Sequence, residues 1–365
     1  MQTSLQGIAE KAKRQPDYRF LNLYTMLNEK NLLDSWRYLK KDAASGIDRV
    51  SARAYEENLH ENIRSLVERL KGKSYRAKLV RRHYIPKGEG KYRPLGIPAI
   101  EDKLVQKAAA RILEAIYEQD FLVYSFGYRP KLGALDAVGE LTYELQFGWF
   151  GYVIDADIKG FFDNINHDWM IRMLSERVSD EAFLRLIRKW LKAGIMDTDG
   201  KVIHPATGTP QGGIVSPILA NIYLHYVLDL WYEKVVKPRS GGSYLCRYAD
   251  DFVCLFRYRE DAERFYRELP ERLGKFGLSI SIEKTRIVRF TKHRMHEQSR
   301  FDFLGFEFRW AKNRRGKPQV KRRTSRKKLR QSLWSFTEWV KKSRNLPLRL
   351  LFSLLNSKLR GYYNY

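Results

Sequence analysis

Aspartates interrupt two apolar segments of this chain, and carboxylates in such places either face water or bind a partner. Asp250 and Asp251 lie in the middle of residues 244–256, where aromatic, leucine, valine and cysteine side chains predict the two strands of a β-hairpin. Asp157 interrupts a similar run in residues 151–165. An aspartate pair alone is common in a solvated turn. Two strands that both present acids instead indicate a site where a divalent cation neutralises them.

Residue alternation predicts how one of these strands presents its acids. In a strand over 152–158, Val153, Asp155 and Asp157 share one face. Both acids therefore point the same way, with Asp155 either supporting Asp157 or serving the structure. Further elements follow from hydrophobic periodicity and turn residues: amphipathic helices at 100–117, 133–145 and 261–276, a strand at 278–288, and two helices within 332–365.

Composition indicates a polyanionic partner. The 365 residues contain 68 Lys and Arg against 42 Asp and Glu, a net charge of +26, and 13% are aromatic. Nucleic acid fits this mixture better than a membrane surface, although a merely basic protein remains an alternative. Both cysteines, Cys246 and Cys254, fall in the predicted hairpin strands and are expected to be buried thiols in a reducing compartment.

No membrane association is expected. The first residues lack the pattern of a secretory signal. Residues 213–232 are long and mostly apolar, but Asn221, His225 and Asp229 recur every four residues and form one polar stripe. We therefore expect a buried helix with one face toward a site or water, in a cytoplasmic protein.

The acidic segments resemble a known family. The sequence YADD at 248–251 and the sequence DIKGFFD at 157–163 resemble the two carboxylate motifs of reverse transcriptases, in particular those that group II introns encode. The resemblance implies that Asp157, Asp250 and Asp251 are catalytic. It also implies that they and Ile158 form the binding set for two Mg²⁺ ions about 4 Å apart, with Mn²⁺ as a substitute.

The same resemblance extends to other motifs in the expected order. A basic hairpin over 75–98 is similar to the fingers hairpin and implies that Lys87 and Arg93 bind the triphosphate of the incoming nucleotide. Further implied roles fall into three groups: nucleotide contacts at Phe162, Gln211 and Lys284; template contacts at Gly212 and Gly213; and primer support at Phe303, Leu304 and Gly305.

Each of these roles has a plainer alternative. The cations could be generic backbone-binding or surface residues, and Phe162 could be a core residue. As a gate, the Phe162 ring would leave no room for the 2′-hydroxyl of a ribonucleotide. Residues 309–330 contain twelve Lys or Arg and no acid, which is typical of a mobile solvated arm or of a clamp on a nucleic-acid backbone.

The expected fold is α+β, a right-hand polymerase with fingers, a palm built on an antiparallel sheet with helices on one face, and a partial helical thumb. The expected divisions are 1–98 for an N-terminal extension and fingers, 99–310 for the palm, and 311–365 for a basic linker and partial thumb. The expected enzyme extends a DNA or RNA primer with dNTPs on an RNA template and binds group II intron RNA. Alternatives are a maturase with secondary polymerase activity, a domesticated or CRISPR-associated reverse transcriptase, and an RNA-dependent RNA polymerase, which Phe162 disfavours.

Overall fold

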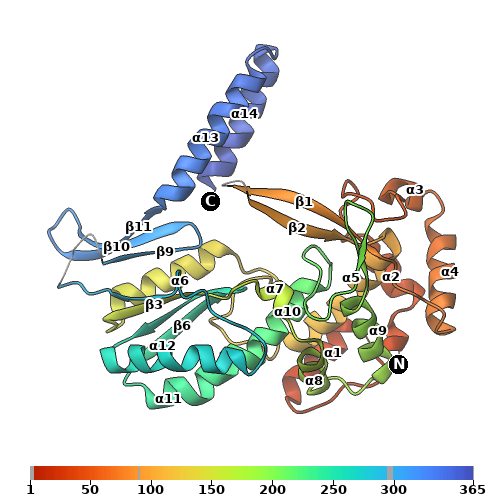
Figure 1. Ribbon diagram of the computed structural model, residues 1–365, viewed down its shortest axis with the longest axis horizontal. Helices are drawn as coiled ribbons and strands as arrows, with labels where there is room; N and C mark the ends of the chain where they lie inside the picture. The colour runs from red at the N-terminus through yellow and green to blue at the C-terminus, as the bar shows by residue number, and fades with distance from the viewer. Residues whose placement is uncertain (1–3, 89–90, 294–298, 365) are drawn as a thin grey trace.

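A computed structural model describes residues 4–88, 91–293 and 299–364. The chain forms a helical N-terminal part, a central antiparallel sheet, and two C-terminal helices that project from the body (Figure 1). One continuous apolar core runs from Ile8 through the N-terminal helices to Ile280 beneath the central sheet. The first two parts are therefore packed into one unit.

The central sheet has the strand order β6-β7-β3-β8. Its strands are β3 (Tyr152–Asp157), β6 (Ser243–Tyr248), β7 (Asp251–Phe256) and β8 (Arg286–Arg289). The predicted hairpin and the predicted strand at 152–158 are confirmed. The predicted strand at 278–288 is wrong for most of its length, because residues 282–284 turn. The main-chain N–H groups of Lys284 and Thr285 both donate to the Ser281 carbonyl, at 3.0 and 2.9 Å.

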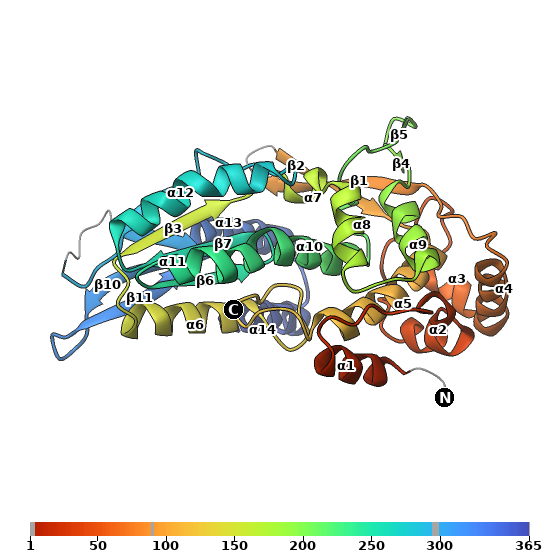
Figure 2. The same cartoon turned by 90° about the horizontal axis from the view of Figure 1, so that it is seen from below.

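Both faces of the central sheet are covered (Figure 2). One face packs on α12 (Arg259–Gly274) and on a long helix made of α10 (Ser216–Leu224), the π-helical segments η2 (His225–Asp229) and η3 (Tyr232–Val236), and α11 (Lys237–Arg239). The other face packs on α6 (Ala134–Phe147) and a second sheet of β9 (Arg300–Phe303), β10 (Phe306–Lys312) and β11 (Pro318–Thr324). The expectation of helices on one face only is wrong, because Val153, Val253 and Leu255 make the second face apolar and α6 helps to bury them.

The N-terminal part combines helices with a four-stranded sheet of order β2-β1-β4-β5. The predicted helix at 100–117 and the predicted basic hairpin are confirmed as α5, β1 and β2. The elements are α1 (Leu5–Arg14), η1 (Tyr24–Met26), α2 (Glu29–Trp36), α3 (Ala52–Glu56), α4 (Leu59–Lys71), β1 (Val80–Gly88), β2 (Lys91–Ile97), α5 (Ile100–Tyr117), α7 (Phe161–Asn164), α8 (His167–Ser175), α9 (Glu181–Leu191), β4 (Ile195–Met196) and β5 (Val202–Ile203).

The C-terminal segment contains α13 (Arg326–Ser343) and α14 (Leu348–Tyr363), which confirms the two helices expected there. The basic run at 309–330 is no mobile arm. It lies on β10, β11 and the start of α13. Alternate residues such as Trp310 and Val320 are buried in a second apolar core, which lies between the central sheet, α6 and the sheet of β9, β10 and β11. Within the described ranges, no helix combines the length and apolar character needed to cross a membrane.

Candidate active site

The three predicted acids meet at one end of the central sheet. Asp157 is the last residue of β3 and lies directly opposite Asp251, the first residue of β7. Residues opposite each other in an antiparallel pair have Cα atoms about 4.5–5.5 Å apart and side chains on the same face. Asp250 belongs to the two-residue turn between Tyr248 and Asp251, which pair in the β6–β7 hairpin. The sheet register therefore brings together acids that are far apart in sequence.

Asp157 and Asp250 line a cavity of about 580 Å³, which we call the acid cavity. This volume falls in the range of small-molecule sites. The predicted residues that also line it are Ile158, Arg93, Phe162, Gln211, Gly212, Gly213 and Lys284. The predicted nucleotide contact Lys87 has a side chain outside the described residues. Tyr92, Tyr128, Lys159 and Ser281 line the cavity as well and were missed by the sequence reasoning.

A close contact between a loop and a strand shapes one wall of the acid cavity. The Gly96 main-chain N–H in β2 donates to the Gln211 carbonyl at 2.6 Å. Gly212 has φ +106°, and a Cβ there would lie 2.8 Å from the Gly96 carbonyl oxygen. Glycine is therefore required at this position by both its backbone angle and the approach of β2. The contact places Gln211 and Arg93 on the same cavity.

Phe162 and Tyr128 face each other at this cavity. Phe162 lies in α7, which follows Gly160 at φ +55°, and its ring contacts Tyr128 edge-on at 6.4 Å between centroids. Its neighbour Phe161 is buried in the core. Phe162 is half-buried, so its ring is available to a ligand. The only sequence signal for Tyr128 is that it is an aromatic residue in the irregular stretch before α6.

Asp251 lines a neighbouring cavity of about 720 Å³, which we call the strand-turn cavity. Leu304 and Gly305 line it from the β9–β10 turn, with φ +50° and +84°. A hydrogen bond from the Leu304 main chain reaches Asp251 and lowers the pKa of its carboxyl, although burial and nearby acids outweigh this effect. Phe303 lines neither cavity: it is buried in the second core, where it supports the turn.

Negative charge accumulates around Asp251. Burial, together with the smaller effects of the neighbouring Asp155, Asp250 and Asp157 in that order, raises the pKa of Asp251 to about 7. Burial likewise raises the pKa of Asp155 to about 6, against the opposing effect of Arg286. A bound cation would stabilise the ionised form of these carboxylates. The site is therefore electrostatically suited to a cation.

Lys284 provides one positive charge at the site. Its Nζ lies 2.6 Å from Oδ2 of Asp157, and this contact raises the pKa of Lys284. Lys284 lies in the turn at residues 282–284, where a strand had been predicted. The ammonium group of Lys284 thus contacts one of the two oxygens of the Asp157 carboxylate.

Comparisons with known proteins agree with this geometry. Residues 85–308 match the family described as reverse transcriptase (RNA-dependent DNA polymerase). Protein YkfC of Escherichia coli K12 is 32% identical over 79% of this chain and 84% of its own length. The group II intron-encoded protein LtrA of Lactococcus lactis is 43% identical over 47% of this chain, but the match spans only 29% of LtrA.

A solved structure shows the same fold at low sequence identity. The telomerase from Candida albicans, solved with a fragment of telomeric RNA, has a TM-score of 0.51 at 15% identity, over 71% of this chain and 50% of that one. This likeness indicates a right-hand polymerase fold. The chain belongs to the reverse transcriptase family, the RNA-directed DNA polymerases, in the group formed by group II intron reverse transcriptases and maturases.

Members of this family generally use divalent metal ions, Mg²⁺ above all. Among the side chains that the structure describes, no three His, Cys, Asp or Glu residues are grouped so as to enclose a metal ion by themselves. Mg²⁺ does not need such a cage, because it is usually held by one or two carboxylates together with substrate phosphates and water. The paired Asp157 and Asp251, with Asp250 beside them, fit that kind of site.

Proposed function

We propose that this protein extends a primer 3′-hydroxyl with dNTPs on an RNA template, with the reaction taking place at the acid cavity. The observation that carries the proposal is the β3–β7 register, which sets Asp157 opposite Asp251 beside the Asp250 turn. Asp157, Asp250 and Asp251 would hold two Mg²⁺ ions, with the main chain of Ile158 completing the set. Bound Mg²⁺ would stabilise charge on the attacking and leaving oxygens.

The remaining residues of the acid cavity would bind and select the nucleotide. Arg93, an exposed residue of β2 at the cavity, would hold phosphate oxygens with its planar guanidinium, assisted by Lys87. Lys284, displaced from Asp157, would pair with the leaving phosphates. The Phe162 ring would leave no room for a 2′-hydroxyl and so reject ribonucleotides.

The template and primer would lie on either side of the acids. Gln211, Gly212 and Gly213 line the acid cavity, where a templating base paired to the nucleotide would contact them. Leu304 and Gly305 line the strand-turn cavity beside Asp251, where they would support the primer end. Phe303 would contribute through the core beneath that turn.

The proposal also divides the chain into the parts of a right hand. We assign residues 1–98 to an N-terminal extension and fingers, 99–310 to the palm, and 311–365 to a linker and partial thumb. The division at 310 falls within β10, so the thumb helices themselves begin at Arg326. The projecting position of α13 and α14 supports their assignment to the thumb (Figure 1).

The resemblance to LtrA supports group II intron RNA as a partner, and with it a maturase role. A net charge of +26 suits an RNA surface larger than one template–primer duplex. A maturase role needs RNA binding rather than nucleotide addition, so the two activities are separable by mutation at the acids.

Primer extension on an RNA template tests the proposal. Asp250→Ala should lower the single-turnover rate by on the order of 10³-fold, since metal binding contributes several kcal/mol to the transition state, and should leave template–primer affinity unchanged. The matched control is Asp168→Ala, an exposed acid of α8 paired with Arg188 at 3.2 Å, which should keep the normal rate. Full synthesis by Asp250→Ala would refute the site. Intron splicing by the same variant would establish the maturase role separately.

A further inference from the structure

A guanidinium group is completely buried directly beneath the acid turn. Arg247, in β6, has 0% exposure and comes two residues before Ala249, the other member of the two-residue turn that carries Asp250. Long cationic side chains are almost never fully buried without partners. Nothing in nucleotide binding accounts for this arginine, which does not line the acid cavity.

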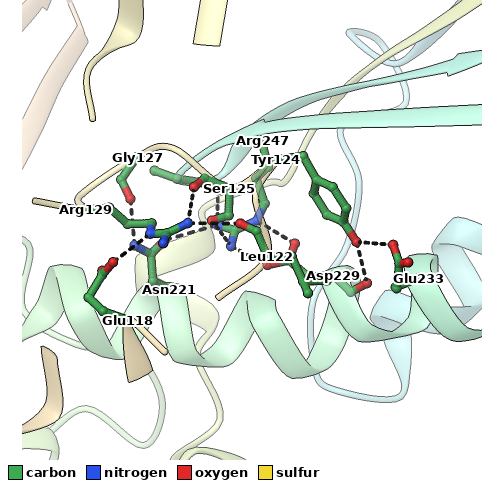
Figure 3. A network of polar contacts seen from close by, with 11 residues as sticks. Glu118, Leu122, Tyr124, Ser125, Gly127, Arg129, Asn221, Asp229, Glu233 and Arg247 are labelled. Carbon is green, nitrogen blue, oxygen red and sulfur yellow. Dashed lines mark hydrogen bonds and ion pairs between the residues drawn. The ribbon is translucent and has the colours of Figure 1, made fainter. Parts of the chain in front are cut away.

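Every N–H of this guanidinium is matched by an acceptor (Figure 3). Asp229 accepts from Nε at 2.7 Å and from Nη2 at 2.6 Å. Nη1 donates to Oδ1 of Asn221 at 3.1 Å and to the Ala249 carbonyl at 3.0 Å, and Nη2 donates to Oγ of Ser125 at 2.6 Å. These are the five donors that arginine has, in a fixed planar arrangement. The guanidinium is therefore fixed in position, and its bond to the Ala249 carbonyl connects it to the turn.

The long helix is distorted in the way that this network requires. Asn221 and Asp229 are eight residues apart, whereas two α-helical turns take about 7.2 residues, so in a regular helix the two side chains would be offset around the axis. The π-helical segment His225–Asp229, with i→i+5 hydrogen bonding, accommodates the extra residue and reduces this offset. Both side chains then point at Arg247 (Figure 3). Such π segments occur frequently at functional sites.

His225, the third member of the polar stripe, does not join the network. Its ring packs edge-on against Phe121 at 5.7 Å, and its Nδ1 has no hydrogen-bond partner among the described residues. Burial lowers its pKa to about 4, which keeps the ring neutral. The polar stripe thus separates into one core histidine and two residues that orient Arg247.

The turn is also fixed from its other side. Ala249 has φ +57°, a left-handed angle that is unfavourable for alanine. Gly127 packs against it so closely that a Cβ on Gly127 would lie 2.2 Å from the Ala249 nitrogen. Nδ2 of Asn221 donates to the Gly127 carbonyl at 2.6 Å, so Asn221 contacts both Arg247 and the glycine beneath the turn. The strained turn is held between a hydrogen-bonded cation and a packed backbone.

We infer that Arg247, oriented by Asp229 and Asn221, is a positioning residue for nucleotide addition: its bond to the Ala249 carbonyl sets the angle at which the turn presents Asp250. The inference rests on the proposed role of Asp250 at the acid cavity. Stability alone does not explain the network, because a buried ion pair often contributes no more than apolar residues of the same volume. A metal-binding carboxylate, in contrast, must be held within about 0.5 Å.

Single-turnover primer extension at varied Mg²⁺ tests the inference in the full chain. Asp229→Asn and Arg247→Lys should each lower the rate at saturating Mg²⁺ on the order of 10-fold, and the double variant Arg247→Met/Asp229→Leu about 100-fold, since a 1 Å misplacement of reacting groups has that effect. The half-saturating Mg²⁺ concentration should rise in all three, while template–primer affinity stays unchanged. The double variant guards against misfolding because it leaves no unpaired buried charge.

Arg177→Lys is the matched control. Arg177 is a second buried arginine, 4% exposed, which pairs with Asp120 at 3.0 Å and donates to main-chain carbonyls at the N-terminal helices, away from the turn. Its loss should lower the melting temperature without changing the Mg²⁺ dependence. If folded Arg247 and Asp229 variants show the wild-type rate and Mg²⁺ dependence while Asp250→Ala is inactive, the inference is wrong and the proposed function stands. If Asp250→Ala is active, the proposed function itself fails.

Discussion

Gly127→Ala should slow nucleotide addition about 100-fold while leaving nucleic-acid binding intact. Gly127 lies beneath the turn that carries Asp250, and its carbonyl accepts a hydrogen bond from Asn221. The alanine Cβ would point into the turn rather than into solvent. The perturbation therefore reaches the acids without altering any side chain of the cavity.

The magnitude follows from the contacts that the new Cβ would make. It would lie 2.2 Å from the Ala249 nitrogen, 2.8 Å from the Tyr248 carbonyl carbon and 3.0 Å from the Ala249 Cα, where ordinary van der Waals contact begins at 3.4 Å. All three are main-chain atoms of the strained turn, so the turn must move by about 1 Å. A displacement of this size at reacting groups costs about 100-fold in rate. Overpacking of this kind also destabilises a fold by about 1–3 kcal/mol.

The assay is single-turnover incorporation of one dNTP on an RNA template, with melting temperature and template–primer affinity measured on the same preparation. Gly139→Ala in α6 is the matched control, because no atom lies within 4 Å of its added Cβ. That variant should retain the wild-type rate and gain roughly 1 kcal/mol of helix stability. A folded Gly127→Ala enzyme with the wild-type rate would show that the position of the turn does not govern catalysis.

Three further predictions follow from the site and its surroundings. Phe162→Val should raise ribonucleotide incorporation relative to dNTP by about 10-fold or more, measured as a ratio of kcat/KM values; an unchanged ratio would make Phe162 a core residue. Lys284→Met should tighten Mn²⁺ binding to the free protein, because the substitution removes the cation that contacts Asp157, and it should raise KM for dNTP. Electron paramagnetic resonance measures the Mn²⁺ affinity, and weaker binding would contradict the prediction. Burial raises the pKa of Asp102 to about 6, above its unfolded value near 3.8, so the folded state binds a proton more tightly than the unfolded state does. The free energy of unfolding should therefore fall by about 3 kcal/mol as the pH rises from about 4 to about 6. Wild-type melting temperature relative to Asp102→Asn should therefore fall across that range; a flat difference would contradict the shift.

Much of the local structure could be predicted from the sequence because it depends on local patterns. Apolar, β-prone runs interrupted by acids predicted β3 and the β6–β7 hairpin, and helical periodicity predicted α5 with the bounds observed. Where tertiary structure overrides a local pattern, the prediction failed: residues 278–282 alternate like the start of a strand, yet the chain turns at once around the Ser281 carbonyl. The high density of positive charge over 309–330 likewise suggested a mobile arm, yet β10 and β11 form there because their alternate residues are buried while the cations stay exposed.

The sequence by itself determined the family and the residues that we propose to carry the chemistry, namely the acids of the two motifs and the cations of the basic hairpin. Only the tertiary structure decided how they meet. The pairing of Asp157 with Asp251 is a matter of strand register, and the bond between Lys284 and Asp157 depends on a turn. The bonds from Arg247 to Asn221 and Asp229 depend on the path of the long helix, which includes a π-helical segment between those two residues. The chemistry that a side chain can perform depends on its residue type, which the sequence gives directly. Strand register, helix phase and burial depend on contacts between distant segments, which form only when the chain folds.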